Sequence, residues 1–250
     1  MITLAHIHEY GNGKLEPEQA DIKATLESRG IECILFTTKR IHRNQLTLNA
    51  NTLVAADHPT MEAVFKRIGY QHTLNSYPTS LRPYLKRTVW ESTVGKLLAC
   101  SQSGTVVNIF IKPKTKAKLF TGFVVESVTD LYSLHRMSKH TQLYCSSVVA
   151  WASEYRVYVT DGTIVGVKHY EGNPEITLNM AEVERAVADL EASEERTRAY
   201  GIDFGVLSTG ETALIEWNDG FALGSYGLEA EVYTDLIVAR WEEIAKAAFA

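Results

Sequence analysis

The first third of the chain alternates short apolar runs with helical patterns, and this alternation limits the fold more than any other feature. A helix is predicted over residues 17–29, where Ile22 and Leu26 recur at helical spacing and Gly30 is suited to end it. Another is predicted over residues 58–69, with proline in its first turn and glycine at its end. The predicted strands cover residues 2–7, 31–36 and 52–57. Alternating strands and helices predict a small parallel α/β lobe.

The rest of the chain is dominated by strands with hairpin signals. A polar segment with two prolines, residues 71–83, predicts a linker. Asp161 and Gly162 separate two apolar-rich runs, which predicts a hairpin, and a second hairpin is expected over residues 202–218 with its turn at Ser208–Gly210. Helices are expected over residues 88–101, 180–201 and 234–249, a short helical stretch over 130–138, and further strands over 105–113 and 122–128. This pattern predicts an α+β arrangement and a domain boundary that divides residues 1–80 from residues 81–250.

Composition narrows the classes of function. The net charge is -5, so nucleic acid binding is not expected. No apolar run approaches the roughly 18 residues that a membrane span requires, and the first residues lack the pattern of a secretory signal, so we expect a cytoplasmic protein without a membrane partner. Cys33, Cys100 and Cys145 are widely spaced and form no zinc or dithiol motif.

A lysine-rich segment follows the apolar run at residues 109–113. Lys112, Lys114, Lys116 and Lys118 alternate along the chain, so in an extended conformation they share one face and repel one another unless an anion compensates. This favours a phosphate site. The alternative is a strand that ends in lysine because the charge prefers water.

A second group of polar residues lies on one predicted strand. Glu154, Arg156, Tyr158 and Thr160 fall on the same side of it. If this side lines a cleft, the guanidinium can pair with phosphate oxygens and the carboxylate can accept hydroxyl hydrogen bonds. The alternative is a surface ion pair worth under about 1 kcal/mol.

The second predicted hairpin brings oxygen ligands together. Glu216 and Asn218 face the same way on one strand, and Asp203 can lie across from them on the other. Such a set suits Mg²⁺, which takes one or two carboxylates and completes its shell with water and phosphate. The alternative is an exposed strand end that runs into a turn at residues 218–220, which fits Glu216 less well because its neighbours are apolar.

In this order the segments resemble the ATP-grasp superfamily. The resemblance rests on the sequences IKP, KLFTGFV, SEYRVYV, GIDFGV and LIEWNDG, and it covers roughly residues 80–228. More specifically, the chain resembles small phage and bacterial ATP-grasp proteins with a Glu-x-Arg strand and a Lys-x-Phe-Thr-Gly segment. The resemblance implies an N-terminal α/β lobe over residues 1–80, then an α+β ATP-grasp domain over residues 81–250 with ATP between two lobes.

The resemblance also implies a role for individual residues. Arg156 and Lys168 would face the terminal phosphate as catalytic residues. The implied ATP-binding residues are Lys112 on the α- and β-phosphates, Lys118 on the covering loop, Ser147, Val148 and Val149 in a hinge that reads adenine, and Glu154 on the ribose. The implied metal ligands are Asp203, Glu216 and Asn218. Ser147 stands where many relatives have glutamate, so adenine recognition would depend more on the backbone, and the covering loop lacks the usual run of glycines.

The implied activity is that of an ATP-dependent carboxylate–amine ligase with ATP and Mg²⁺. It would convert a carboxylate-bearing substrate to an acylphosphate, which an amine or peptide acceptor then attacks. The N-terminal lobe, which has no phosphate motif, is expected to contribute to the acceptor site. A phosphotransferase acting on a hydroxyl and a catalytically silent nucleotide-binding protein are the alternatives, and a homodimer is left open.

Overall fold

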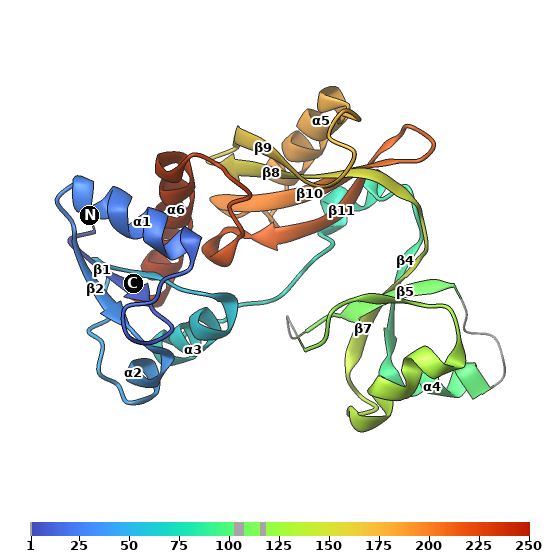
Figure 1. Ribbon diagram of the computed structural model, residues 1–250, viewed down its shortest axis with the longest axis horizontal. Helices are drawn as coiled ribbons and strands as arrows, with labels where there is room; N and C mark the ends of the chain where they lie inside the picture. The colour runs from blue at the N-terminus through green and yellow to red at the C-terminus, as the bar shows by residue number, and fades with distance from the viewer. Residues whose placement is uncertain (1, 103–107, 116–118) are drawn as a thin grey trace.

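The computed structural model describes residues 2–102, 108–115 and 119–250 and contains three sheets (Figure 1). A parallel sheet of order β2-β1-β3 lies in the N-terminal lobe. Two antiparallel sheets, of orders β11-β10-β8-β9 and β4-β7-β5-β6, follow. We call them the central sheet and the small sheet. The α/β lobe and the ATP-grasp-like α+β arrangement predicted from the sequence are both confirmed.

The N-terminal lobe forms because local signals start and stop each helix. Asp57 caps α3, its carboxylate accepting from the amide of Thr60 at 3.0 Å, and Gly69 ends the helix with a φ of 73°. Pro17 occupies the first turn of α1, where its missing N–H costs nothing. The elements are β1 (Leu4–His8), α1 (Pro17–Ser28), β2 (Glu32–Phe36), α2 (Thr38–His42), β3 (Thr52–Ala55) and α3 (His58–Ile68).

The central sheet contains both predicted hairpins. Asp161 and Gly162 both have positive φ, 48° and 74°, as a tight two-residue hairpin turn requires. β10 is buried along its whole length between β8 and β11. The elements are β8 (Trp151–Thr160), β9 (Thr163–Gly172), α5 (Met180–Glu191), β10 (Ala199–Leu207) and β11 (Thr212–Asp219). The helix predicted over residues 180–201 is too long, because its last residues already belong to β10.

The small sheet corrects another expectation. Residues 88–101 were expected to be helical throughout, but residues 89–93 form a strand that pairs with β7. The β-branched and aromatic side chains of this stretch suit a strand, and pairing with a distant partner decided the outcome. The elements are β4 (Val89–Thr93), α4 (Val94–Gln102), β5 (Ile109–Pro113), β6 (Phe123–Val125), the 3-10 helix η2 (Val128–Arg136) and β7 (Gln142–Ser147). Residues 105–107 of the predicted strand lie outside the described residues.

The last helix returns to the first lobe. α6 (Ala230–Ala248) packs against α1 and β3, and Trp241 and Leu236 share a core with Ile7 and Leu53 of the N-terminal lobe. The 3-10 helix η3 (Gly220–Ala222) leads toward α6, and another, η1 (Thr79–Tyr84), ends the predicted linker. The division at residue 80 stays a prediction, but the core of the first lobe includes the C-terminal helix.

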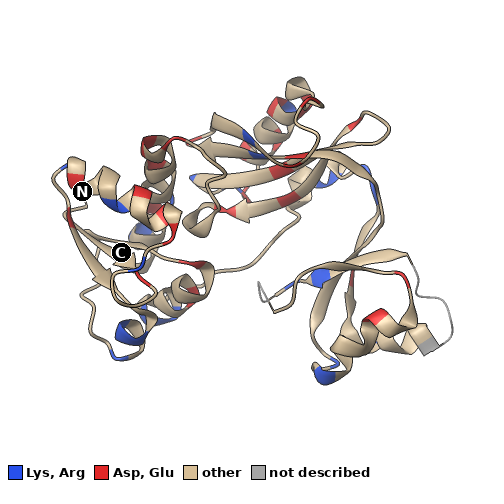
Figure 2. Cartoon of the chain, viewed as in Figure 1, with Lys and Arg blue, Asp and Glu red and all other residues tan. Residues whose placement is uncertain are grey.

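Acidic and basic residues occur in the N-terminal lobe and around both antiparallel sheets (Figure 2). Within the described ranges, no helix combines the length and apolar character needed to cross a membrane.

Candidate active site

A cavity of about 520 Å³ lies between the small sheet and the central sheet. The small sheet contributes Lys112 and Phe110 from β5, and the central sheet contributes side chains from β8, β10 and β11. The connection from β7 to β8, which joins the two sheets, also lines it. Of the residues predicted for the site, the cavity wall contains Lys112, Ser147, Val148, Val149, Glu154, Arg156, Asp203 and Glu216. Segments distant in the sequence therefore meet at one cavity.

The carboxylates of the second hairpin meet as the sequence predicts. Asp203 lies directly opposite Glu216 in the β10–β11 register. The Asn218 amide nitrogen donates to Asp203 Oδ2 at 3.2 Å and to Glu216 Oε1 at 3.3 Å. These three side chains form one polar cluster at the cavity wall.

Arg156 neutralises Asp203 from the neighbouring strand. Its Nε and a terminal nitrogen donate to the two carboxylate oxygens, both at 2.7 Å, and the two residues are only 7% and 3% exposed. The same guanidinium lies 4.9 Å from the ring centroid of Tyr226. Burial raises the pKa of Asp203 above its ordinary value, although the hydrogen bonds and charge of Arg156 oppose this. The pair is bidentate and withdrawn from water.

Lys112 links the two sheets across the cavity. Its ammonium pairs with Glu216 and lies 4.4 Å from the ring centroid of Tyr77. Burial alone would lower the pKa of Lys112, but the charge of Glu216 raises it above its ordinary value. For Glu216 burial would raise the pKa, but the charge and hydrogen bond of Lys112 lower it. Both groups are therefore ionised at neutral pH.

Residues 84–236 match a protein family whose model is described as an "ATP-grasp domain", the second family of its clade. The chain belongs to the ATP-grasp superfamily. A search of curated protein sequences finds no match.

Solved ATP-grasp structures share the fold at low sequence identity. D-alanine–D-alanine ligase from Bacillus anthracis is 13% identical with a TM-score of 0.59, and the alignment covers 98% of each chain. The macrocyclase MdnC from Microcystis aeruginosa MRC, bound with precursor peptide MdnA, is 12% identical with a TM-score of 0.53, covering 94% of this chain and 99% of that one. N5-carboxyaminoimidazole synthetase from Staphylococcus aureus is 9% identical with a TM-score of 0.51, covering 96% of this chain and 77% of that one.

The donor set of this ATP-grasp site fits Mg²⁺. Asp203 and Glu216 supply carboxylate oxygens and Asn218 an amide oxygen, whereas Mg²⁺ needs only one or two carboxylates when phosphate and water complete its shell. In the described part of the chain, no group of three or more His, Cys, Asp or Glu side chains could hold a metal ion. A site here would therefore depend on phosphate oxygens to complete its shell.

Glu154 lies at the end of the cavity near the β7–β8 connection. The Tyr170 hydroxyl donates to it at 2.9 Å, and the Tyr170 ring stacks on Tyr226 with centroids 4.9 Å apart. Burial raises the pKa of Glu154, although the Tyr170 hydrogen bond lowers it. The carboxylate therefore has a fixed orientation and a free acceptor capacity toward the cavity.

Two predicted lysines are not part of this wall. Lys168 lies on β9 opposite Arg156 in the strand register but is not among the described residues that line the cavity. Lys118 lies outside the described residues.

Sequence reasoning missed the aromatic and basic residues that frame the cavity. Tyr77, Tyr170 and Tyr226 contact predicted site residues, and Arg87 donates to the carbonyl of Ile215 at 2.8 Å. Only Tyr170 had a usable signal, because it lies on the strand that the Asp161–Gly162 turn pairs with β8. The others reach the site from loops or from segments distant in sequence.

Proposed function

We propose that this ATP-grasp protein is an ATP-dependent carboxylate–amine ligase. The observation that carries the proposal is the cluster in which Lys112 and Arg156 pair with Glu216 and Asp203 beside Asn218, at the wall of a cavity between two sheets. Two proteins of similar fold are named as a D-alanine–D-alanine ligase and a macrocyclase bound to a precursor peptide, which supports carbon–nitrogen bond formation.

In the proposed arrangement, ATP occupies the cavity with its phosphates toward the charged cluster. Lys112 would contact the α- and β-phosphates, and the backbone at residues 147–149 would recognise adenine. Glu154 would accept hydrogen bonds from the ribose hydroxyls. Lys118 would help to hold the covering loop.

Phosphoryl transfer here depends mainly on positioning and charge. A substrate carboxylate oxygen would form a bond to the γ-phosphorus while the bond to the β–γ bridging oxygen breaks and ADP leaves. Arg156 and Lys168 are proposed to stabilise charge on the terminal phosphate. Bound Mg²⁺, held by Asp203, Glu216 and Asn218, would neutralise phosphate charge.

The second half of the reaction forms the new bond. An amine nitrogen would attack the carbonyl carbon of the acylphosphate, the carbon–oxygen bond to phosphate would break, and inorganic phosphate and a proton would be released. Closure of the two sheets would exclude water, which would otherwise hydrolyse the acylphosphate.

Calorimetry tests the nucleotide site first. We expect Mg-ATP to bind the wild-type protein with a dissociation constant from low micromolar to millimolar, within the range of about 1 μM–1 mM usual for enzyme substrates. Glu216→Gln should weaken turnover more than binding. Glu211→Gln removes the same charge from the exposed turn of the same hairpin and should change neither. Absence of heat with folded protein, ATP and magnesium would refute the proposal.

Hydroxylamine trapping tests the reaction. A panel of amino acids and short peptides is incubated with ATP and hydroxylamine, which converts an acylphosphate to a hydroxamate. Hydroxamate together with ADP supports the ligase. ADP with a phosphorylated hydroxyl product, and no hydroxamate, would instead indicate a phosphotransferase, and ATP binding without turnover on any substrate would indicate a silent nucleotide-binding protein.

A further inference from the structure

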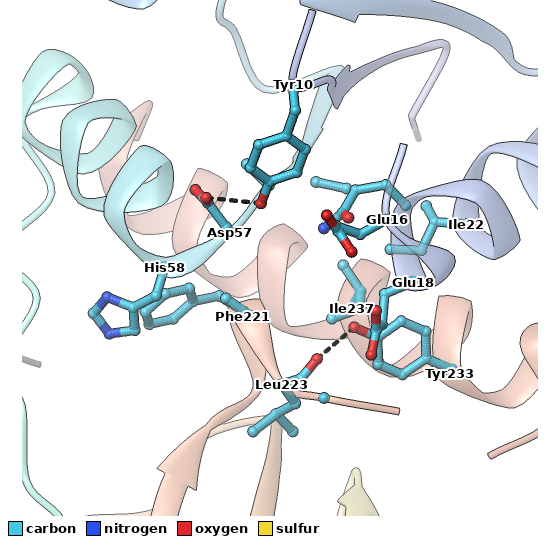
Figure 3. Close-up of a pocket in the computed structure, with 15 residues that line it drawn as sticks. Tyr10, Glu16, Glu18, Ile22, Asp57, His58, Phe221, Leu223, Tyr233 and Ile237 are labelled. Carbon is cyan, nitrogen blue, oxygen red and sulfur yellow. Dashed lines mark hydrogen bonds between the residues drawn. The ribbon is translucent and has the colours of Figure 1, made fainter. Parts of the chain in front are cut away.

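A smaller cavity, of about 180 Å³, lies in the N-terminal lobe and is separate from the nucleotide cavity (Figure 3). Tyr10, the start of α1 and the start of α3 form one side of it, and residues 221–224 with α6 form the other. We call it the lobe cavity. It has no assigned function in the proposed arrangement of ATP.

The polar groups of the lobe cavity are acceptors. Glu16, Glu18 and Asp57 contribute carboxylates, and none of the described residues that line it is a lysine or arginine. Tyr10 donates its hydroxyl hydrogen to Asp57 at 2.9 Å, and the serine amide at position 225 donates to Glu18 at 3.2 Å. Burial alone would raise the pKa of Asp57, but hydrogen bonds from Thr60 and Tyr10 hold it below its ordinary value. The cavity therefore has an uncompensated negative charge at neutral pH.

Gln19 gives an independent sign of a missing donor. This residue lines the same cavity, is only 8% exposed, and its Oε1 has no hydrogen-bond partner. A buried acceptor left without a donor costs about 1–3 kcal/mol. A ligand N–H group in the cavity would satisfy it.

The walls of the cavity limit the kind of cation. The apolar side chains of Ile22, Ile237 and Leu223 and the ring of Phe221 line it together with the carboxylates. Figure 3 shows Glu16, Asp57 and Tyr10 around the same central space, with Phe221 and Leu223 on the side toward the central sheet. Within the described ranges, no three acidic, histidine or cysteine side chains are close enough to hold one metal ion. Spread carboxylates with apolar walls suit an alkylammonium or alkylguanidinium better than a point charge.

The lobe cavity is connected to the catalytic cluster by shared walls. Residues 221–224 and His58 also line a third cavity, of about 420 Å³, whose opposite wall contains Lys112, Arg156 and Glu216. The segment that bounds the lobe cavity thus continues directly to the charged cluster. A substrate anchored in the lobe cavity could extend toward the site where the acylphosphate would form.

We propose that the lobe cavity binds the cationic end of an alkylamine or alkylguanidine that forms part of the acceptor substrate. This inference depends on the proposed ligase function for the word acceptor, but the binding of the cation itself does not. Glu16, Glu18 and Asp57 supply the charge, Gln19 accepts a hydrogen bond, and the apolar walls contact the alkyl stem.

Calorimetry with butylammonium chloride, without nucleotide, tests the inference. Wild-type protein should bind butylammonium at least about tenfold more tightly than 1-butanol, which has the same stem without the charge. Glu16→Gln should weaken butylammonium binding about five- to tenfold, because one charged acceptor becomes neutral. Gln19→Leu should also weaken it, without changing the charge.

The controls separate this inference from the proposed function. Glu32→Gln removes a carboxylate from the exposed start of β2 in the same lobe and should leave butylammonium binding unchanged. All three variants should bind Mg-ATP as the wild type does. Equal binding of butylammonium and butanol, equal affinity in Glu16→Gln and Glu32→Gln, or tighter binding of calcium chloride that Glu16→Gln abolishes would each overturn the inference. Amine binding with no Mg-ATP binding would sustain it while the ligase proposal fails.

Discussion

Replacing Arg156 by lysine tests how much the buried pair contributes to stability. Lysine keeps the charge but has no planar fork, so it can satisfy only one of the two Asp203 oxygens that now accept at 2.7 Å. A hydrogen bond to a charged group contributes about 1.5–3 kcal/mol, so we expect Arg156→Lys to lower the free energy of unfolding by about 2 kcal/mol. Arg156→Met leaves a buried carboxylate uncompensated and should cost about 3–5 kcal/mol.

The chain provides a matched control for this experiment. Arg198 also makes a two-pronged contact with a carboxylate, donating to Asp161 at 2.8 and 3.2 Å, but its side chain is 39% exposed. Because water competes for such a pair, Arg198→Lys should cost less than about 1 kcal/mol. Urea unfolding without ligands, followed by circular dichroism and tryptophan fluorescence, gives the midpoint and slope for each variant. If the two lysine variants lose the same stability, burial of the Arg156 pair does not decide its contribution.

Three further predictions concern stability, pH and metal. Burial alone would raise the pKa of Glu195, but hydrogen bonds from the backbone amides at the start of η1 lower it, so its stabilisation should be complete above the unfolded pKa of about 4.3 and disappear as the pH falls through the lower folded value; Glu195→Gln should flatten that acid limb of the stability curve. Gly220→Ala should cost about 1–3 kcal/mol in thermal unfolding, because its new methyl group would meet the backbone carbonyl of residue 199, whereas Gly224→Ala makes only ordinary contacts and should cost less. Removing magnesium with a chelator should weaken ATP binding by at least about tenfold, and this loss should shrink in Glu216→Gln.

Local signals allowed much of the fold to be predicted. The Asp161–Gly162 turn requires positive φ at two successive residues, which an Asp-Gly pair supplies, and the predicted hairpin is confirmed. Once a hairpin is fixed, the period of two along each strand places Asp203 across from Glu216, as the register shows. These relations depend on residues close together in the sequence.

The rest of the site depends on pairings that no local pattern encodes. Arg156 and Asp203 are 47 positions apart and meet only because β8 lies beside β10. Lys112 and Glu216 are 104 positions apart and belong to different sheets. The sequence predicted which of these residues carry chemistry, but it assigned both cations to phosphate. No pattern in it indicated that, without ligands, each cation pairs with a carboxylate predicted to hold metal.

This internal pairing has a consequence for binding order. In the ligand-free structure the two cations and two carboxylates neutralise one another, so ATP alone finds no unpaired positive charge at the cluster and would leave two buried carboxylates uncompensated if it drew Lys112 and Arg156 away. Magnesium alone would displace those cations without an anion to receive them. When phosphate and metal enter together, each cation can exchange a carboxylate for a phosphate oxygen while each carboxylate exchanges its cation for the metal, and no buried charge is left unpaired. We therefore expect the Mg-ATP complex, and not either component alone, to be the species that the cluster binds.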